Sequence, residues 1–241
     1  MNGVTGRIHS IQTLGTLDGP GVRFVVFLQG CPLRCGVCHN PDTWSPTGGV
    51  EHTAAELADM ALRYRAYFGR EGGVTLSGGE PLLQAEFAAA FFEECHARGL
   101  HTCLDTAGCI LSDGVRELLS HTDRVLLDIK YKSDALYRAN VGCGIDTPLS
   151  FLAELDAKRI KTTLRQVVVP TLNDDEENDA FLSGLIASHP CIDKIELLPF
   201  RKLCSVKYEN LGIPFPFSRY PEGDRDESAA REKTLSEFLC K

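Results

Sequence analysis

The strongest constraint on the fold is a regular alternation of short apolar runs with segments of helical periodicity. Six runs rich in Val, Ile, Leu or Phe have the length of buried strands: 23–29, 74–77, 101–105, 124–130, 162–170 and 194–200. Helical patterns occupy 53–68, 85–98, 112–121, 134–140, 149–158, 175–188 and 227–239. Thr53 and Glu56 have the spacing of a capping box at the start of the first helix. This alternation predicts a sheet of parallel strands joined by right-handed crossovers.

Six strand–helix units can form an open doubly wound sheet or a curved, incomplete barrel, and periodicity does not choose between them. In either fold the functional site lies at the C-terminal ends of the strands. The chain has 241 residues, 43% of them hydrophobic, which suffices for one large core. We expect a single domain with a core at about 20–200, an N-terminal extension at 1–19 and a Pro-rich, charged tail at 201–241.

The net charge of the chain limits its partners. A formal charge of -8 argues against non-specific binding of nucleic acids or anionic membranes, which requires clustered Lys and Arg. The N-terminus lacks the pattern of a signal peptide, and no apolar run is long enough to span a membrane. We therefore expect a cytoplasmic monomer whose partners are small molecules or other proteins.

Three of the ten cysteines form a compact motif in GCPLRCGVCHNPDTW (30–44). Cys31, Cys35 and Cys38 have the spacing C-x3-C-x2-C on a loop that follows the first predicted strand. Three thiolates so spaced can hold three irons of a 4Fe-4S cluster and leave the fourth iron open. From spacing alone, two alternatives stay open: a zinc site completed by His39 or a distant cysteine, and a cysteine-rich loop without a metal.

The other seven cysteines show no repeating interval. They are Cys95, Cys103, Cys109, Cys143, Cys191, Cys204 and Cys240. In a chain of this length without a signal peptide, such cysteines are typically reduced and buried as small apolar residues.

A second motif, SGGEP (77–81), directly follows the second predicted strand. Gly78 and Gly79 have no side chains to cover their backbone polar groups, so these groups can bind an amino or carboxylate group of a ligand. Glu80 adds an acceptor for an ammonium group. Taken alone, however, the motif is more simply explained as a strand-to-helix turn.

Together, the two motifs resemble those of the radical S-adenosylmethionine (SAM) superfamily. CPLRCGVC lies after the first strand, and GGEP lies after the second. The resemblance implies a partial (β/α)6 barrel in which the open iron binds the amino and carboxylate groups of SAM. It also implies that one-electron reduction of the cluster cleaves SAM to methionine and a 5′-deoxyadenosyl radical that abstracts a hydrogen atom.

Further segments are similar to those of the pyruvate formate-lyase activating enzymes, which are activases of glycyl radical enzymes. These segments are GRIHS (6–10), DGPGVRF (18–24), CHNPDTW (38–44), HTCLDTAG (101–108), LLDIK (126–130) and ELLPF (196–200). The resemblance extends to about residue 200. Many other activases carry a ferredoxin-like insertion with additional cysteines; this chain has no cysteine between Cys38 and Cys95, so the resemblance implies one cluster.

The resemblance also assigns roles to individual residues. It implies that Cys31, Cys35 and Cys38 ligate the cluster. The implied SAM-binding residues are Val37, Cys38, His39, Gly78, Gly79, Glu80, Asp105, Thr106, Asp128, Ile129, Lys130, Arg165 and Arg201. Asp105, Thr106 and Asp128 match positions that hold a monovalent cation, Na⁺ or K⁺. Asp18 and His39 match positions near the substrate.

Simpler explanations exist for several of these residues. Asp105 and Asp128 follow or end strands, where an acidic side chain commonly caps a helix. Lys130 and Arg165 could each form a salt bridge to Asp128 or to another acid. Asp18 could merely begin a turn in the sequence DGPG.

The resemblance implies two protein partners. One is pyruvate formate-lyase or a close relative, whose glycine loses a hydrogen atom; the other is flavodoxin or ferredoxin as electron donor. Oxygen would destroy the cluster and the glycyl radical, so we expect function under anaerobic conditions. The chain departs from the family pattern at Arg201, where the family has a histidine, and in its tail from Lys202 onward. A radical SAM enzyme acting on a small molecule and a structural zinc or iron–sulfur protein are the alternatives.

Overall fold

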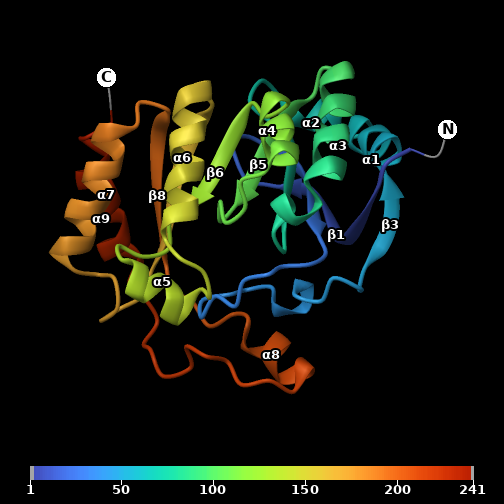
Figure 1. Cartoon of the computed structure of the whole chain (residues 1–241). Helices are drawn as coiled ribbons and strands as arrows, with labels where there is room; N and C mark the ends of the chain where they lie inside the picture. Colours follow the sequence, from blue (N-terminus) through green and yellow to red (C-terminus); the bar gives the residue numbers. More distant parts are fainter. Residues whose placement is uncertain (1–2, 240–241) are drawn as a thin grey trace. The chain divides into compact units, whose positions relative to one another are not determined.

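The structure, a computed structural model, describes residues 3–239 (Figure 1). Its strands are β1 (Thr5–Gly15), β2 (Arg23–Leu28), β3 (Val50–Thr53), β4 (Gly73–Gly78), β5 (His101–Thr106), β6 (Arg124–Asp128), β7 (Lys161–Val168) and β8 (Ile192–Pro199). Its α-helices are α1 (Ala54–Leu62), α2 (Arg65–Phe68), α3 (Ala85–Ala97), α4 (Asp113–Ser120), α5 (Asp134–Asn140), α6 (Asp146–Lys158), α7 (Glu176–Ser188), α8 (Ser205–Leu211) and α9 (Arg225–Ser236). The hydrogen-bonded strand order is β3-β1-β2-β4-β5-β6-β7-β8, which is an open sheet.

The chain folds into two compact units. The first unit comprises Met1–Pro32 and Thr43–Leu126, and the second comprises Leu33–Asp42 and Leu127–Lys241. The division falls within the cysteine motif, because Cys31 belongs to the first unit whereas Cys35 and Cys38 belong to the second.

The first unit is built around β2. This strand pairs in parallel with β4, and β4 pairs in parallel with β5, so these three strands end at the same edge of the sheet. On its other side β2 pairs antiparallel with β1, which pairs antiparallel with β3. Phe24, Val25, Val26 and Leu28 of β2 are all fully buried, as expected for a strand covered on both faces.

A buried arginine shapes the turn that precedes β2. Arg23 is completely buried, and burial lowers its pKa. Its guanidinium donates to Thr75 Oγ1 at 2.9 Å and to the carbonyls of Glu71 and Val74. Thr75 in turn donates to the carbonyl of Asp18 at 2.7 Å. These bonds offset the cost of burying the charge. They also anchor the backbone of Asp18, which begins the DGPG segment.

The first predicted helix begins as expected and ends early. Thr53 caps α1, and the reciprocal bonds of the Thr53–Glu56 capping box are both present. The helix predicted over 53–68 is interrupted, however, because i→i+3 bonds at Arg63 and Tyr64 tighten its last turn. The ring of Tyr64 then packs on Phe24, with ring centroids 5.8 Å apart, before α2 begins at Arg65.

The second unit contains the parallel pair of β7 and β8. Asp175 caps α7 by accepting a hydrogen bond from the backbone N–H of Asn178. A salt bridge between Arg231 and Asp179, with Nη2 and Oδ1 2.5 Å apart, joins α9 to α7. The backbone N–H of Leu197 in β8 donates to Glu232 of α9 at 2.8 Å. These contacts hold the second half of the predicted C-terminal tail against the sheet.

The structure confirms the six predicted parallel strands and corrects the prediction at three places. β1 and β3 are antiparallel strands that the sequence analysis missed, and β1 lies in the segment expected to be an extension. Gly6, His9 and Ser10 interrupt the apolar alternation of β1, so its pattern does not indicate a strand. The third correction is α8, which lies in the tail.

Two further findings concern the whole described chain. No helix within residues 3–239 is both long and apolar enough to cross a membrane. Within that range Cys95, Cys103, Cys191 and Cys204 are buried, which confirms the predicted burial for these four. Cys109 and Cys143 are half-buried, and Cys240 lies outside the described residues.

Candidate functional site

The SGGEP turn in the first unit packs against the start of the cysteine loop. Gly78 has a φ of +106°, and a Cβ atom on Gly79 would lie 2.2 Å from the carbonyl oxygen of Gly30. The N–H of Gly79 donates to Leu28 and the N–H of Glu80 donates to Gly30, both at 2.9 Å. The two glycines therefore permit a close backbone approach that brings the turn next to Cys31.

The start of the cysteine loop is also tied to the end of the CHNPDTW segment. Gly30 donates its N–H to the carbonyl of Thr43 at 2.7 Å, and Cys31 donates to that of Trp44 at 3.3 Å. CHNPDTW, one of the segments that resemble the activating enzymes, thus supports the backbone of Cys31.

Glu80 is buried and bonded to the chain itself. Its Oε1 accepts from Thr106 Oγ1 at 2.5 Å and from the N–H of Leu82 at 3.1 Å. Its Oε2 accepts from the N–H of Ala107 at 3.0 Å. In the structure the carboxylate joins the SGGEP turn to the end of β5.

We expect Glu80→Gln to lower the free energy of unfolding by about 1–3 kcal/mol, because an amide NH₂ group must then face hydrogen-bond donors. Urea-induced unfolding followed by circular dichroism measures this change. Glu93→Gln on the exposed side of α3 is the matched control, with an expected change within about 0.5 kcal/mol. Equal stability of the two variants would show that the Glu80 network does not support the turn.

Asp105 and Thr106 lie at the C-terminal end of β5. Asp105 Oδ2 accepts from Ser77 Oγ at 2.7 Å, and Thr106 Oγ1 accepts from the N–H of Gly108 at 3.0 Å. Ser112, and not Asp105, caps the following helix α4. The first unit therefore gathers Ser77, Asp105 and Thr106 where β4 and β5 end.

In the second unit, the rest of the cysteine loop is fixed by its backbone. Arg34 donates to the carbonyl of Val141 at 2.9 Å, and Gly36 donates to that of Asn140 at 2.8 Å. Cys35 and Cys38 form a turn in which the N–H of Cys38 donates to the carbonyl of Cys35 at 3.1 Å. The residues Cys31, Cys35 and Cys38 are partly exposed, so the loop that carries them is anchored without being fully buried.

Asp128 holds two cationic side chains in the second unit. Its Oδ2 lies 2.9 Å from Lys130 Nζ, and its Oδ1 lies 3.0 Å from Arg165 Nε. Burial alone would raise the pKa of Asp128, but the two cations lower it to about 2. Burial alone would lower the pKa of Lys130, but Asp128 raises it well above its usual range. The salt-bridge interpretation of Lys130 and Arg165 is confirmed.

The backbone beside these charges is supported by residues that the sequence analysis missed. Tyr137 Oη accepts from the N–H of Lys130 at 3.0 Å, and Asn173 Nδ2 donates to the carbonyl oxygen of Lys130 at 3.3 Å. Gln166 Nε2 donates to the carbonyl of Ile129, which is fully buried. No local pattern marks these three side chains, because their partners are distant in sequence.

His39 and Arg201 meet in the second unit. His39 Nε2 lies 3.1 Å from the backbone oxygen of Arg201. The Arg201 guanidinium turns to Glu222, with Nη1 and Oε2 3.4 Å apart. Arg201 is thus engaged with the tail, and Val37 is buried against Phe200 and Phe217.

The donor set decides which metal group suits the motif. Among residues 3–239, no three His, Cys, Asp or Glu side chains are gathered closely enough to hold a metal ion. The three motif cysteines are partly exposed, and their loop is held by backbone hydrogen bonds. Thiolates from one short loop are the donor set of an iron–sulfur cluster, so these residues fit such a group.

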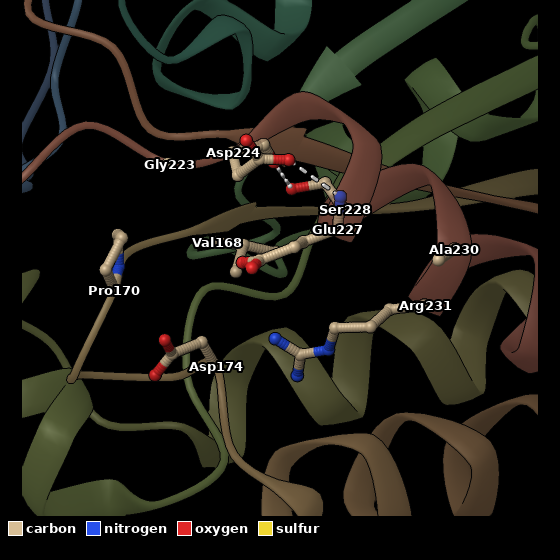
Figure 2. A pocket seen from close by; sticks show the side chains of 9 residues that line it. All are labelled: Val168, Pro170, Asp174, Gly223, Asp224, Glu227, Ser228, Ala230 and Arg231. Carbon is tan, nitrogen blue, oxygen red and sulfur yellow. Dashed lines mark hydrogen bonds between the residues drawn. The ribbon is translucent and has the colours of Figure 1, made fainter.

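A separate pocket in the second unit lies between the end of β7 and α9 and has a volume of about 300 Å³. Figure 2 shows the side chains that line it: Val168, Pro170, Asp174, Gly223, Asp224, Glu227, Ser228, Ala230 and Arg231. Asp224 caps α9 by accepting from the N–H groups of Asp226 and Glu227. Because Asp224 and Arg231 serve the helix cap and the salt bridge to Asp179, we assign this pocket no ligand.

Comparison with known proteins adds independent findings. Residues 17–142 match the family described as "4Fe-4S single cluster domain". The chain is 45% identical over 237 residues to the pyruvate formate-lyase-activating enzyme of Clostridium pasteurianum, covering 98% of this chain and 99% of that protein. It is 42% identical over 212 residues to the pyruvate formate-lyase 1-activating enzyme of Escherichia coli K12, covering 87% and 86% of the two chains.

The fold also resembles that of solved structures. A radical SAM methyltransferase from Sphaerobacter thermophilus superposes with a TM-score of 0.64 at 17% identity, covering 90% of this chain and 64% of that chain. At this identity the similarity concerns the fold alone. It agrees with the predicted partial (β/α)6 barrel of parallel strands, whose sheet is open rather than closed.

Proposed function

Since the chain belongs to the family of pyruvate formate-lyase-activating enzymes, which are radical SAM enzymes, we propose that it activates pyruvate formate-lyase or a close glycyl radical enzyme. In this proposal, a hydrogen atom is removed from one glycine of the partner. The observation that carries the proposal is the 45% identity over 98% of the chain, which includes both the cysteine motif and the SGGEP turn.

We assign Cys31, Cys35 and Cys38 as the three protein ligands of one 4Fe-4S cluster, with SAM as the second cofactor. When bound, these groups supply the electron and the carbon-centred radical that hydrogen abstraction requires. The anchored, partly exposed loop supports this assignment, because its thiols are held without being covered.

The proposed SAM-binding residues do different tasks. Gly78, Gly79 and Glu80 hold the turn against the backbone of Gly30, and thus position the residues beside Cys31. The other proposed residues are Val37, His39, Asp105, Thr106, Asp128, Ile129, Lys130, Arg165 and Arg201. The paired charges around Asp128 support binding of the polar groups of SAM by residues 128–130. Asp18 and His39 are proposed to face the substrate.

A monovalent cation, Na⁺ or K⁺, is part of the proposal. Asp105 and Thr106 supply carboxylate and hydroxyl oxygens at the end of β5, and hard oxygen donors suit such a cation. Both carboxylate oxygens of Asp128 already contact cationic side chains. To bind the cation as well, Asp128 would have to exchange one of these contacts.

We further propose that the protein works as a cytoplasmic monomer under anaerobic conditions, with flavodoxin or ferredoxin as electron donor. The net charge of -8 supports protein and small-molecule partners over nucleic acid.

The test is to reconstitute the cluster anaerobically, add dithionite and SAM, and measure 5′-deoxyadenosine with and without pyruvate formate-lyase. We expect cleavage of SAM, together with a glycyl radical signal in the partner by electron paramagnetic resonance. Absence of 5′-deoxyadenosine in both mixtures would refute the radical SAM chemistry. Cleavage without a glycyl radical in the partner would instead favour a small-molecule substrate.

A further inference from the structure

We propose that the C-terminal segment Arg201–Tyr220 clamps the cysteine loop, with Tyr208 and Lys207 as positioning residues for Cys38. The clamped part of the cysteine loop is Cys35–Asp42 of the second unit. This inference rests on the proposed function in one respect, namely that Cys35 and Cys38 are cluster ligands. It assigns a task to the part of the chain that departs from the family pattern.

Tyr208 makes the most direct contact between the clamp and a cluster ligand. It lies on α8, its side chain is 1% exposed, and its hydroxyl donates to the backbone carbonyl of Cys38 at 3.2 Å. Its ring packs against Phe215, with ring centroids 4.9 Å apart. Because the ring is fixed by packing, the hydroxyl holds the peptide group of Cys38 in one orientation.

Lys207, the preceding residue of α8, binds the loop just beyond Cys38. Its Nζ lies 2.9 Å from Asn40 Oδ1 and 3.0 Å from Asp42 Oδ2. Asp42 belongs to the short 3₁₀ helix Pro41–Thr43 that follows the loop. Two successive residues of α8 therefore fix both the last cysteine and the chain that leaves it.

Phe217 makes the third contact, on the residues between Cys35 and Cys38. A Cβ atom on Gly36 would lie 2.0 Å from Phe217 Cε1, so the loop approaches the ring closely enough to require glycine. Phe217 is 5% exposed and forms a buried cluster with Val37 and Phe200. The tail thus covers the middle of the cysteine loop with an apolar surface.

These contacts point to an effect on the cluster itself. Residues that orient metal ligands typically change metal affinity or activity about 10–100-fold when they are replaced. Hydrogen bonds and burial near an iron–sulfur cluster also change its reduction potential. We therefore expect changes in the clamp to alter how firmly the cluster is held and how easily it is reduced.

The first test compares Tyr208→Phe with Tyr220→Phe after anaerobic reconstitution. Tyr220 lies in the same segment, and its hydroxyl accepts from Arg219. The rate of iron loss to a chelator is followed by absorbance, and the midpoint potential of the cluster is measured by a redox titration. Loss of one hydrogen bond predicts iron release about fivefold faster than in the unmodified protein. It also predicts a lower midpoint potential, because the Cys38 carbonyl dipole loses its proton donor.

Tyr220→Phe should match the unmodified protein in both measurements. If Tyr208→Phe also matches it, the clamp proposal is overturned. If the unmodified protein assembles no 4Fe-4S cluster, the proposed function fails instead, so the two failures are distinguishable.

A second set of variants tests the other contacts. Lys207→Met removes the ammonium that binds Asn40 and Asp42, whereas Lys207→Arg keeps a cationic donor. We expect iron release to be faster in Lys207→Met and largely restored in Lys207→Arg. Identical rates in these two variants and in the unmodified protein would remove Lys207 from the proposal.

Discussion

Cys35→Ala is expected to abolish the iron–sulfur cluster and to reduce SAM cleavage by at least about 100-fold, more than loss of an outer-shell partner typically costs. The loop supplies the three thiolates that we assign as cluster ligands, and the substitution removes one of them. Iron and sulfide content, the visible absorption of the cluster and the yield of 5′-deoxyadenosine measure the effect on the reconstituted protein.

Cys143→Ala is the matched control for this prediction. Cys143 is a partly exposed cysteine outside the motif, so its replacement should leave iron content and SAM cleavage unchanged. Retention of the cluster in Cys35→Ala would contradict the ligand assignment. Zinc without iron–sulfur absorption in the unmodified protein would favour the structural metal site that the cysteine spacing left open.

Asp128→Asn is expected to lower the free energy of unfolding by about 3 kcal/mol near neutral pH. The substitution removes the negative charge between Lys130 and Arg165, and leaving partly buried cations without their counter-ion is strongly destabilising. Urea-induced unfolding of the cluster-free protein measures the change. The matched control is Glu196→Gln, which removes the partner of the more exposed Lys194 and should cost less than about 1 kcal/mol.

The same substitution should change how stability depends on pH. The pKa of Asp128 is about 2 in the folded protein and therefore lies below its unfolded value. The folded state then binds fewer protons, so the stabilisation is present above about pH 4 and is lost as the pH falls toward about 2. This component amounts to about 2–3 kcal/mol, and Asp128→Asn lacks it. The free energies of unfolding of the unmodified protein and of Asp128→Asn are compared over this range. A difference between them that stays constant from pH 5 to about pH 2 would show that Asp128 is not the titrating group.

The parallel part of the fold was predictable because its signal is local. β2 consists of β-branched and aromatic residues that are buried on both faces, so its apolar run is visible without knowledge of its neighbours. The cap of α1 at Thr53 was predictable for the same reason, since a capping box lies within four consecutive residues. β1 was missed because it packs through pairing with β2 and β3, and its polar residues obscure the apolar alternation.

For the candidate site, the residues that carry the chemistry could be predicted from the sequence, whereas the contacts that support them could not. The spacing of Cys31, Cys35 and Cys38 is a property of one short segment, and so is the SGGEP turn. By contrast, only the fold shows that the Glu80 carboxylate contacts Thr106 and Ala107.

The set of thiolates, the glycine turn and the series of parallel strands could be predicted, because each depends on residues that are neighbours in the chain. The contacts that hold them in place come from long-range packing. Asp128 meets Arg165 across 37 residues, and Tyr208 meets Cys38 across 170 residues. Such pairs form when distant segments pack together, and no local pattern of residues records which partner each side chain will find.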